Sequence, residues 1–187
     1  MNTQTTYMVI DNFLTNPDET REFALAQDFS RPGNYPGLRT APIESDSIIE
    51  AIAELLRPHA GEITEVLGTN YQLVTCEKKS WVHVDCNNTW AGVLYLTPDA
   101  PATGGTGFYK HRETGVEFET PDNKELADYA TTQGSDYTKW ELTDMVANRY
   151  NRLVLFRGNH FHSSMEYFGQ CDETARLFQA FFITTEF

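Results

Sequence analysis

The sequence predicts an α+β fold that is mainly β, and three observations support this. Apolar residues follow helical spacing only up to residue 58, and after residue 70 short runs of period two replace it. Aromatic residues make up 13% of the chain, which is typical of sheet-packed interiors. The length of 187 residues is near the usual size of one domain. We therefore expect a single domain over residues 1–187, with a helical N-terminal support (1–70) and a β core (71–187).

The first 70 residues predict one strand and two helices. Tyr7 to Ile10 is typical of a strand, and Thr15 or Asn16 is a candidate cap for a helix that follows. Residues 31–46 contain three prolines and two glycines, so we expect an irregular connection there. Apolar residues at helical spacing then predict a second helix over residues 46–58, ended by its proline.

The remainder of the chain predicts short strands interrupted by one polar insertion. The insertion covers residues 110–150, with a helix near Glu125 to Tyr129 and another near Trp140 to Val146. The predicted strands are Tyr71 to Cys76, Ser80 to Asp85, Ala91 to Thr97, Gly107 to Tyr109, Arg152 to Phe156 and Leu177 to Thr184.

Charge and composition restrict the partners and the compartment. The chain has 14 Lys+Arg against 27 Asp+Glu, a formal net charge of −13, which argues against nucleic acid as a partner. No apolar run approaches the roughly 20 residues that span a bilayer, and residues 1–14 have no basic residue, so we expect no membrane partner and no signal or presequence. Cys76, Cys86 and Cys171 are an odd number without CxxC spacing, which favours a reducing, cytoplasmic setting; Cys86 is expected to have a packing role.

Two distant segments carry residues typical of metal ligands. In a strand over residues 81–85, side chains alternate between faces, so His83 and Asp85 would share one face. Downstream, an apolar strand is followed by His160 and His162, and closure of the sheet could bring one of them to the same metal. A His-x-Asp pair alone is a weak signal. Two imidazoles and one carboxylate, however, are the ligand set of non-haem Fe(II) oxygenases, because they leave open positions for cosubstrate and dioxygen.

An arginine begins the last apolar strand. Arg176 lies 14 positions after His162 (176 − 162), and such a residue is costly to bury unless it is paired, so we expect an anion to bind it. A guanidinium donates two N–H bonds to one carboxylate, which suits the distal carboxylate of 2-oxoglutarate. The alternative is a structural salt bridge to an acidic residue of the chain.

Taken in order, these motifs resemble the Fe(II)/2-oxoglutarate-dependent oxygenase superfamily, in its prolyl-hydroxylase-like branch. The resemblance covers residues 80–110 and 150–183 through His-x-Asp, a strand with Tyr-Leu, Gly-Gly, a distal His and then Arg. The segments Val9–Leu14 and Tyr35–Arg39 also resemble the start of small bacterial and phage members. The resemblance implies a double-stranded β-helix (jelly roll, cupin-like) with the N-terminal helices packed on one sheet.

The same resemblance implies roles for individual residues. His83, Asp85 and His162 would be the catalytic iron ligands, with Arg176 and Tyr95 holding the distal carboxylate of 2-oxoglutarate. The cofactors implied are Fe(II), 2-oxoglutarate as cosubstrate, and O2. The activity implied is a dioxygenase that hydroxylates a peptide or small-molecule C–H bond and releases succinate and CO2. A carboxylate at Asp85 favours hydroxylation, since an iron halogenase would need a small residue there.

Some details stay open at this stage. His162 is preferred to His160 because the resembling proteins carry Phe-His-Ser here, where Ser163 would brace the ring. Many relatives place Ser or Thr two residues after the arginine, whereas this chain has Phe178. The alternative function is a non-catalytic or 2-oxoglutarate-independent cupin-like metal-binding protein. The sequence predicts neither the substrate nor the oligomeric state. Candidate aromatic residues at the substrate opening are Tyr35, Trp81, Trp90, Tyr109 and Trp140.

Overall fold

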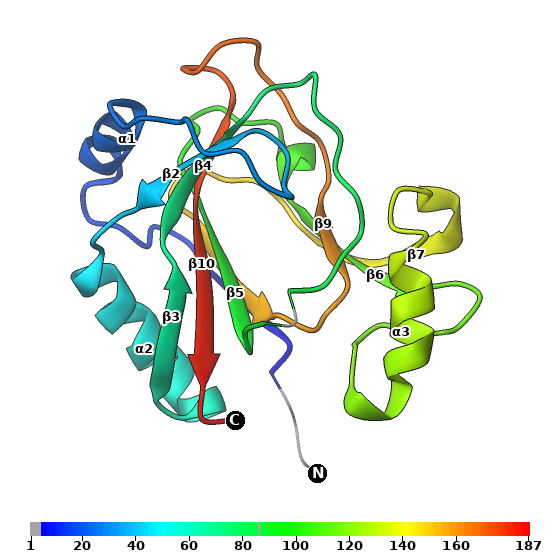
Figure 1. Ribbon diagram of the computed structural model, residues 1–187. Coiled ribbons are helices and arrows are strands. Elements are labelled where there is room, and N and C mark those ends of the chain that lie inside the picture. The colour runs from blue at the N-terminus through cyan, green and yellow to red at the C-terminus, as the bar shows by residue number, and fades with distance from the viewer. Residues whose placement is uncertain (1–4, 86) are drawn as a thin grey trace.

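The protein is mostly β and consists of two antiparallel sheets with helices on the outside (Figure 1). This computed structural model describes residues 5–85 and 87–187, so the packing role predicted for Cys86 lies outside the described residues. The larger sheet has the order β1-β8-β5-β10-β4-β2, with β3 also paired to β10, and the smaller has the order β7-β6-β9. The sheets face each other as in a β-sandwich, because Phe108 of the smaller one packs against Phe156 of the larger. The mainly β prediction is confirmed.

The bounds of the elements follow chain order. The strands are β1 (Tyr7–Ile10), β2 (Leu38–Pro42), β3 (Ile63–Gly68), β4 (Asn70–Val74), β5 (Trp90–Tyr95), β6 (Thr106–His111), β7 (Trp140–Val146), β8 (Leu153–Arg157), β9 (His162–Ser164) and β10 (Arg176–Thr185). The α-helices are α1 (Pro17–Leu25), α2 (Asp46–Ala60) and α3 (Lys124–Thr131), and the 3-10 helices are η1 (Ala102–Gly104), η2 (Pro121–Asn123) and η3 (Tyr137–Lys139). No helix in the described part of the chain is long and apolar enough to cross a bilayer.

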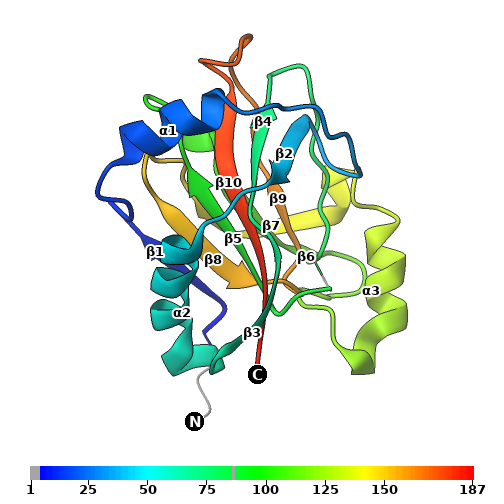
Figure 2. The same ribbon diagram turned by 60° about the vertical axis from the view of Figure 1, so that its left-hand side comes forward.

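Helices α1 and α2 cover one face of the large sheet, as predicted, while the small sheet and α3 lie on the other side (Figures 1 and 2). Helix α1 begins after Asn16, one of the two predicted caps. Helix α2 continues two residues beyond Pro58, to Ala60. The predicted helix, which ended at the proline, is therefore two residues too short. A proline in the last turn removes only one backbone donor, and Gly61 at φ 74° then ends the helix.

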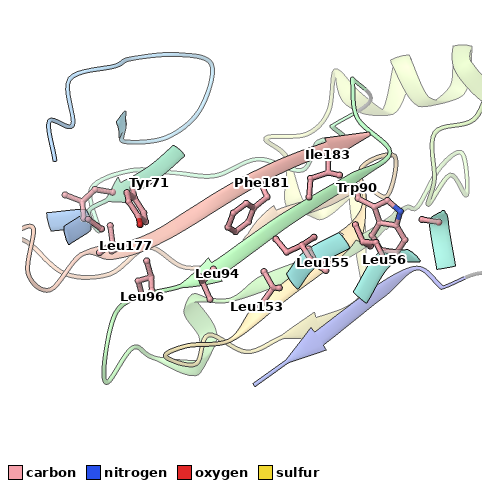
Figure 3. Close-up of a cluster of buried hydrophobic side chains, with 14 of the residues drawn as sticks. Leu56, Tyr71, Trp90, Leu94, Leu96, Leu153, Leu155, Leu177, Phe181 and Ile183 are labelled. Atoms are coloured by element: carbon pink, nitrogen blue, oxygen red, sulfur yellow. The ribbon is translucent and has the colours of Figure 1, made fainter. Parts of the chain in front are cut away.

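The core between the large sheet and these helices is built from alternate residues of the central strands (Figure 3). Leu94, Leu155 and Phe181 are fully buried there, and Leu56 of α2 packs into the same cluster. Residues one position along each strand point to the opposite face, toward the small sheet. The period-two pattern therefore places one face of β5, β8 and β10 in a hydrophobic core and leaves the other face to form the cavity described below.

Replacing Phe181 by alanine is expected to lower the free energy of unfolding by about 3–5 kcal/mol, because a fully buried ring leaves a cavity that its neighbours only partly fill. Urea unfolding followed by circular dichroism measures the change. Leu142→Ala is the control, since Leu142 is 46% exposed on the edge strand β7 and its truncation should cost at most about 0.5 kcal/mol. Equal losses in the two variants would contradict this assignment of the core.

One predicted helix is wrong, because residues 140–146 form the strand β7. Only Trp140 and Val146 of this strand are buried, and the five residues between them are exposed. The strand lies at the edge of the small sheet, and β6 is its one partner among the described strands. A two-sided exposed edge strand has no alternation of polar and apolar residues, so its sequence lacks the signal that identified the other strands.

The predicted irregular connection over residues 31–46 contains the strand β2, which the sequence did not reveal. Gly37 adopts φ 76°, and the following residues pair with β4, with Leu38 opposite Leu73 and Arg39 opposite Gln72. The pairing is long-range, so the local proline and glycine content correctly predicts the turn and misses the strand. The strand β3, whose one partner among the described strands is the distant β10, was also missed.

Candidate metal centre and its cavity

The segment Ser80–Asp85 was predicted as a strand, and the structure corrects this to an extended segment with a single β-bridge between His83 and His162. Its backbone pairs with three separate partners: Val82 N donates to Gly134 O, His83 N to His162 O, and Asp85 N to Gly158 O. No ladder forms, but side chains of an extended segment still alternate. Val82 packs in a buried cluster, while His83 and Asp85 line the cavity between the sheets.

Three side chains from two distant parts of the chain converge at this bridge. One ligand atom each of His83, Asp85 and His162 lies within 4.8 Å of the others. The Nε2 atom of His162 is 3.4 Å from Oδ2 of Asp85, and the Nε2 atom of His83 is 4.0 Å from Oδ1. His162 is buried, and the other two are partly exposed to the cavity. The predicted convergence is therefore observed, while the role of these residues as ligands stays a prediction.

Backbone carbonyls fix the tautomer of both histidines. The Nδ1 of His83 lies 3.0 Å from the carbonyl oxygen of Trp81, and the Nδ1 of His162 lies 2.8 Å from that of His160. A carbonyl only accepts hydrogen bonds, so each Nδ1 carries a proton, and in the neutral form of such a ring the lone pair is on Nε2. Both lone pairs face Asp85, which is the arrangement that metal-binding histidines need.

The protonation states of this group also suit a divalent cation. Burial, together with the nearby His162, lowers the pKa of His83 to about 4, so the ring is neutral at pH 7. Burial raises the pKa of Asp85, but the neighbouring His162 side chain, followed by His83 and Arg39, outweighs burial and lowers this pKa below its usual value. Asp85 is therefore a carboxylate, and both residues can bind a metal without first losing a proton.

His160, the alternative distal ligand, lies outside this group. Its ring is stacked between Phe108 and Phe118, with centroid distances of 4.7 and 4.1 Å. The strand β9 begins only at His162, so the two histidines do not share one strand face as a continuous strand would require. The carbonyl of His160 orients His162, a contact that sequence reasoning missed. Ser163, which was expected to brace that ring, instead bonds the hydroxyls of Tyr109 and Tyr137.

A cavity of 360 Å³ lies between the sheets and contains the three residues. Of the predicted aromatic residues, Tyr35 and Trp81 line it. Trp90 is instead in the core with α2, and Tyr109 and Trp140 pack in the cluster under α3. The other polar and aromatic lining residues, which the sequence analysis did not single out as site residues, are Asn34, Arg39, Gln72, Ser80, Thr106, Thr131, Phe156, Ser164, Tyr167 and Phe182.

Arg176 lies behind the cavity and is fully buried, yet two of its three guanidinium nitrogens have no partner. Nε donates to the carbonyl of Gly104 at 2.9 Å, whereas Nη1 and Nη2 make no hydrogen bond with any residue that the structure describes. The guanidinium carbon is 4.4 Å from the ring of Phe178 and 5.3 Å from that of Tyr95. Tyr95 bonds Thr106, and the cavity reaches Thr106 and Phe178. The predicted alternative, a salt bridge of Arg176, is not seen among the described residues.

A second buried arginine, Arg157, differs from Arg176 because all of its side-chain nitrogens have acceptors. In Arg157, Nε, Nη1 and Nη2 each donate to a backbone carbonyl, those of Thr5, Phe187 and His59, at 3.3 to 3.4 Å. Every side-chain nitrogen of Arg157 thus has an acceptor, in contrast to Arg176. Two buried NH2 groups without acceptors are costly, and such a cost is expected where a ligand supplies the acceptors.

Together the two sheets and the His-Asp-His group define a β-sandwich protein with a candidate metal centre of the two-histidine, one-carboxylate type. The chain belongs to the family of unknown function DUF6445, whose profile matches residues 1–167. No curated protein matches the sequence significantly.

Solved structures share the fold. HygX from Streptomyces hygroscopicus, with nickel and 2-oxoglutarate bound, aligns with a TM-score of 0.66 and 14% identity over 98% of this chain and 84% of HygX. The non-haem α-ketoglutarate-dependent epimerase SnoN from nogalamycin biosynthesis aligns with 0.63 and 15% identity over 97% and 79%. A prolyl hydroxylase from Trichoplax adhaerens, in complex with a hypoxia-inducible-factor peptide, aligns with 0.54 and 13% identity over 97% and 84%. The resemblance to Fe(II)/2-oxoglutarate oxygenases is thus confirmed at the level of the fold.

Proposed function

We propose that this protein is an Fe(II)- and 2-oxoglutarate-dependent dioxygenase, folded as a double-stranded β-helix, that hydroxylates a C–H bond of a peptide or small molecule. The observation that carries the proposal is the buried guanidinium of Arg176, with two unpaired nitrogens, behind the cavity that holds His83, Asp85 and His162. A His-Asp-His metal centre alone would be compatible with many functions. A metal group with an unpaired arginine behind it suits a cosubstrate that has both a chelating end and a distant carboxylate.

Each residue has a defined part in this function. His83, Asp85 and His162 would hold Fe(II), because their lone pairs and charge already converge on one point. Arg176 would bind the distal carboxylate of 2-oxoglutarate, and Tyr95, whose ring centroid is 5.3 Å from the guanidinium carbon, would donate its hydroxyl to the same group. Phe178 would exclude water from that ion pair by covering the guanidinium face. When bound, Fe(II) with 2-oxoglutarate and O2 supplies the oxidation of the substrate C–H bond, with release of succinate and CO2.

The substrate class remains part of the proposal. HygX has also been solved with hygromycin B bound, and the prolyl hydroxylase with a peptide, so proteins of this fold accept both small molecules and peptides. The formal net charge of −13 argues against nucleic acid as a partner of this chain. The cavity is lined by polar residues and by aromatic ones such as Tyr35 and Trp81, which is compatible with a small molecule or a peptide.

Anaerobic titration of the Fe(II)-loaded protein with 2-oxoglutarate tests the proposal. We expect a weak visible charge-transfer band that saturates at one equivalent of 2-oxoglutarate per protein, because the keto acid chelates the iron. Succinate, which cannot chelate through a keto group, is the matched control ligand and should give no band. A folded protein that binds Fe(II) but shows no band would favour the alternative, a 2-oxoglutarate-independent metal-binding protein.

A further inference from the structure

Arg39 is a second arginine on the face of the large sheet that carries the cavity. It lies on β2 opposite Gln72 of β4, and Gln72 lies opposite Phe178 of β10, so the three side chains form one row across the sheet. All three line the cavity. Arg176 also lies on β10, two positions before Phe178 and therefore on the same face. The two arginines reach this region from different strands and are available for different ligands.

The guanidinium of Arg39 is held rigidly. Its Nε donates to Oε1 of Gln72 at 2.7 Å, and the Gln72 amide in turn donates to the carbonyl of Pro36 at 2.7 Å. One face of the guanidinium stacks on Tyr35, 3.8 Å from the ring centroid, and Phe182 lies 5.2 Å away. These contacts fix the plane of the group through its Nε edge and its faces. The Nη edge is left for another partner.

The Nη edge of Arg39 is also unpaired within the described part of this acidic chain. Nη1 and Nη2 of Arg39 make no hydrogen bond or ion pair with the residues that the structure describes, in a chain with 27 Asp+Glu. Burial lowers the pKa of Arg39, and the negative charge of Asp85 partly opposes this. The charge of Arg39 also acts on His83. A fixed, partly dry cation therefore lies within electrostatic reach of the candidate metal centre.

We infer that Arg39 binds a carboxylate of the substrate and thereby holds the substrate against the metal centre, so the substrate is an anionic small molecule or a peptide with a free carboxylate. The inference rests on the function proposed above, which assigns Arg176 to 2-oxoglutarate. The two parallel N–H groups of a guanidinium match the two oxygens of a carboxylate. Stacking on Tyr35 restricts rotation of the Arg39 guanidinium and keeps these N–H groups in place. Arg39 is in this sense a residue that determines specificity.

Calorimetric titration of the anaerobic Fe(II)·2-oxoglutarate protein with N-acetyl amino acids, each as the free acid and as its primary amide, tests the inference. In the wild type, we expect the best free acid to bind about 10- to 100-fold more tightly than its amide, the usual effect of a charge-assisted pair of hydrogen bonds. Arg39→Met should abolish this preference, and Arg39→Lys should retain only part of it, because a lysine keeps the charge and loses the fork. Arg31→Met, at an exposed position of the same segment, should leave it unchanged.

Every other result counts against the inference. Acids that bind no better than their amides overturn it, and so does the case in which neither form binds at millimolar concentration. A preference that survives in Arg39→Met also overturns it. The charge-transfer band with 2-oxoglutarate, measured on the same samples, separates the two proposals. Loss of the band in Arg39→Met alone would assign Arg39 to the cosubstrate site. Absence of the band from the wild type would contradict the proposed function itself. The acid and amide forms would then be compared on the metal-free protein.

Discussion

Asp85→Asn is expected to lower the affinity of the protein for Fe(II) by about 100-fold or more, at or above the upper end of the losses seen when groups that merely orient a ligand are removed. Asp85 supplies the one carboxylate of the group, and its lowered pKa keeps it charged at pH 7. An amide presents a neutral oxygen of similar size and cannot balance the charge of a divalent cation. Competition against a chromophoric chelator under anaerobic conditions measures the affinity.

The fold should survive this substitution, because Asp85 anchors its segment through the backbone: its N–H donates to the carbonyl of Gly158 at 2.6 Å. The thermal midpoint of the metal-free variant should therefore stay close to that of the wild type. Asp122→Asn, at an exposed position in η2, is the matched control and should bind iron as the wild type does. Unchanged iron affinity in Asp85→Asn would show that the His-Asp-His group is not the metal centre.

The sequence predicted most of the central strands and the residues that meet in the cavity, for a local reason. Strands β5, β8 and β10 are buried on both faces and rich in apolar residues, so their sequences identify them. The spacing of His83 and Asp85 was also sufficient, although the segment that carries them is not a regular strand. An extended backbone alternates its side chains whether or not a neighbouring strand completes a ladder.

What the sequence did not reveal depends on contacts between distant segments. Arg39 looked like part of a turn-rich connection, and only the pairing of β2 with β4 places it beside Gln72 in the cavity. The carbonyl of Gly104, which holds Arg176, has no side-chain signal in the sequence. The preference for His162 over His160 came from the resemblance, and the start of β9 at His162, which separates the two rings, is visible only in the structure. Edge strands and backbone acceptors are thus the parts that need coordinates.

Arg176→Met is expected to weaken 2-oxoglutarate binding by about 100-fold or more, since the variant loses two charge-assisted hydrogen bonds to one carboxylate. The same variant should be as stable as the wild type, or more stable, when no 2-oxoglutarate is present. In the wild type Arg176 is fully buried with two nitrogens unpaired, and replacing such a charge with an apolar side chain of similar length removes a desolvation cost. Titration of the charge-transfer band and urea unfolding of the cosubstrate-free protein measure the two effects.

Arg157→Met gives the opposite pattern if the difference between the two buried arginines is functional. Each of its three side-chain nitrogens donates to a main-chain oxygen, so its removal breaks three partly buried hydrogen bonds and should lower the free energy of unfolding by about 1–3 kcal/mol. Its affinity for 2-oxoglutarate should not change, because Arg157 lines no part of the cavity. A stability loss in Arg176→Met as large as that in Arg157→Met, with 2-oxoglutarate still bound tightly, would make Arg176 a structural residue and remove the observation on which the proposed function rests.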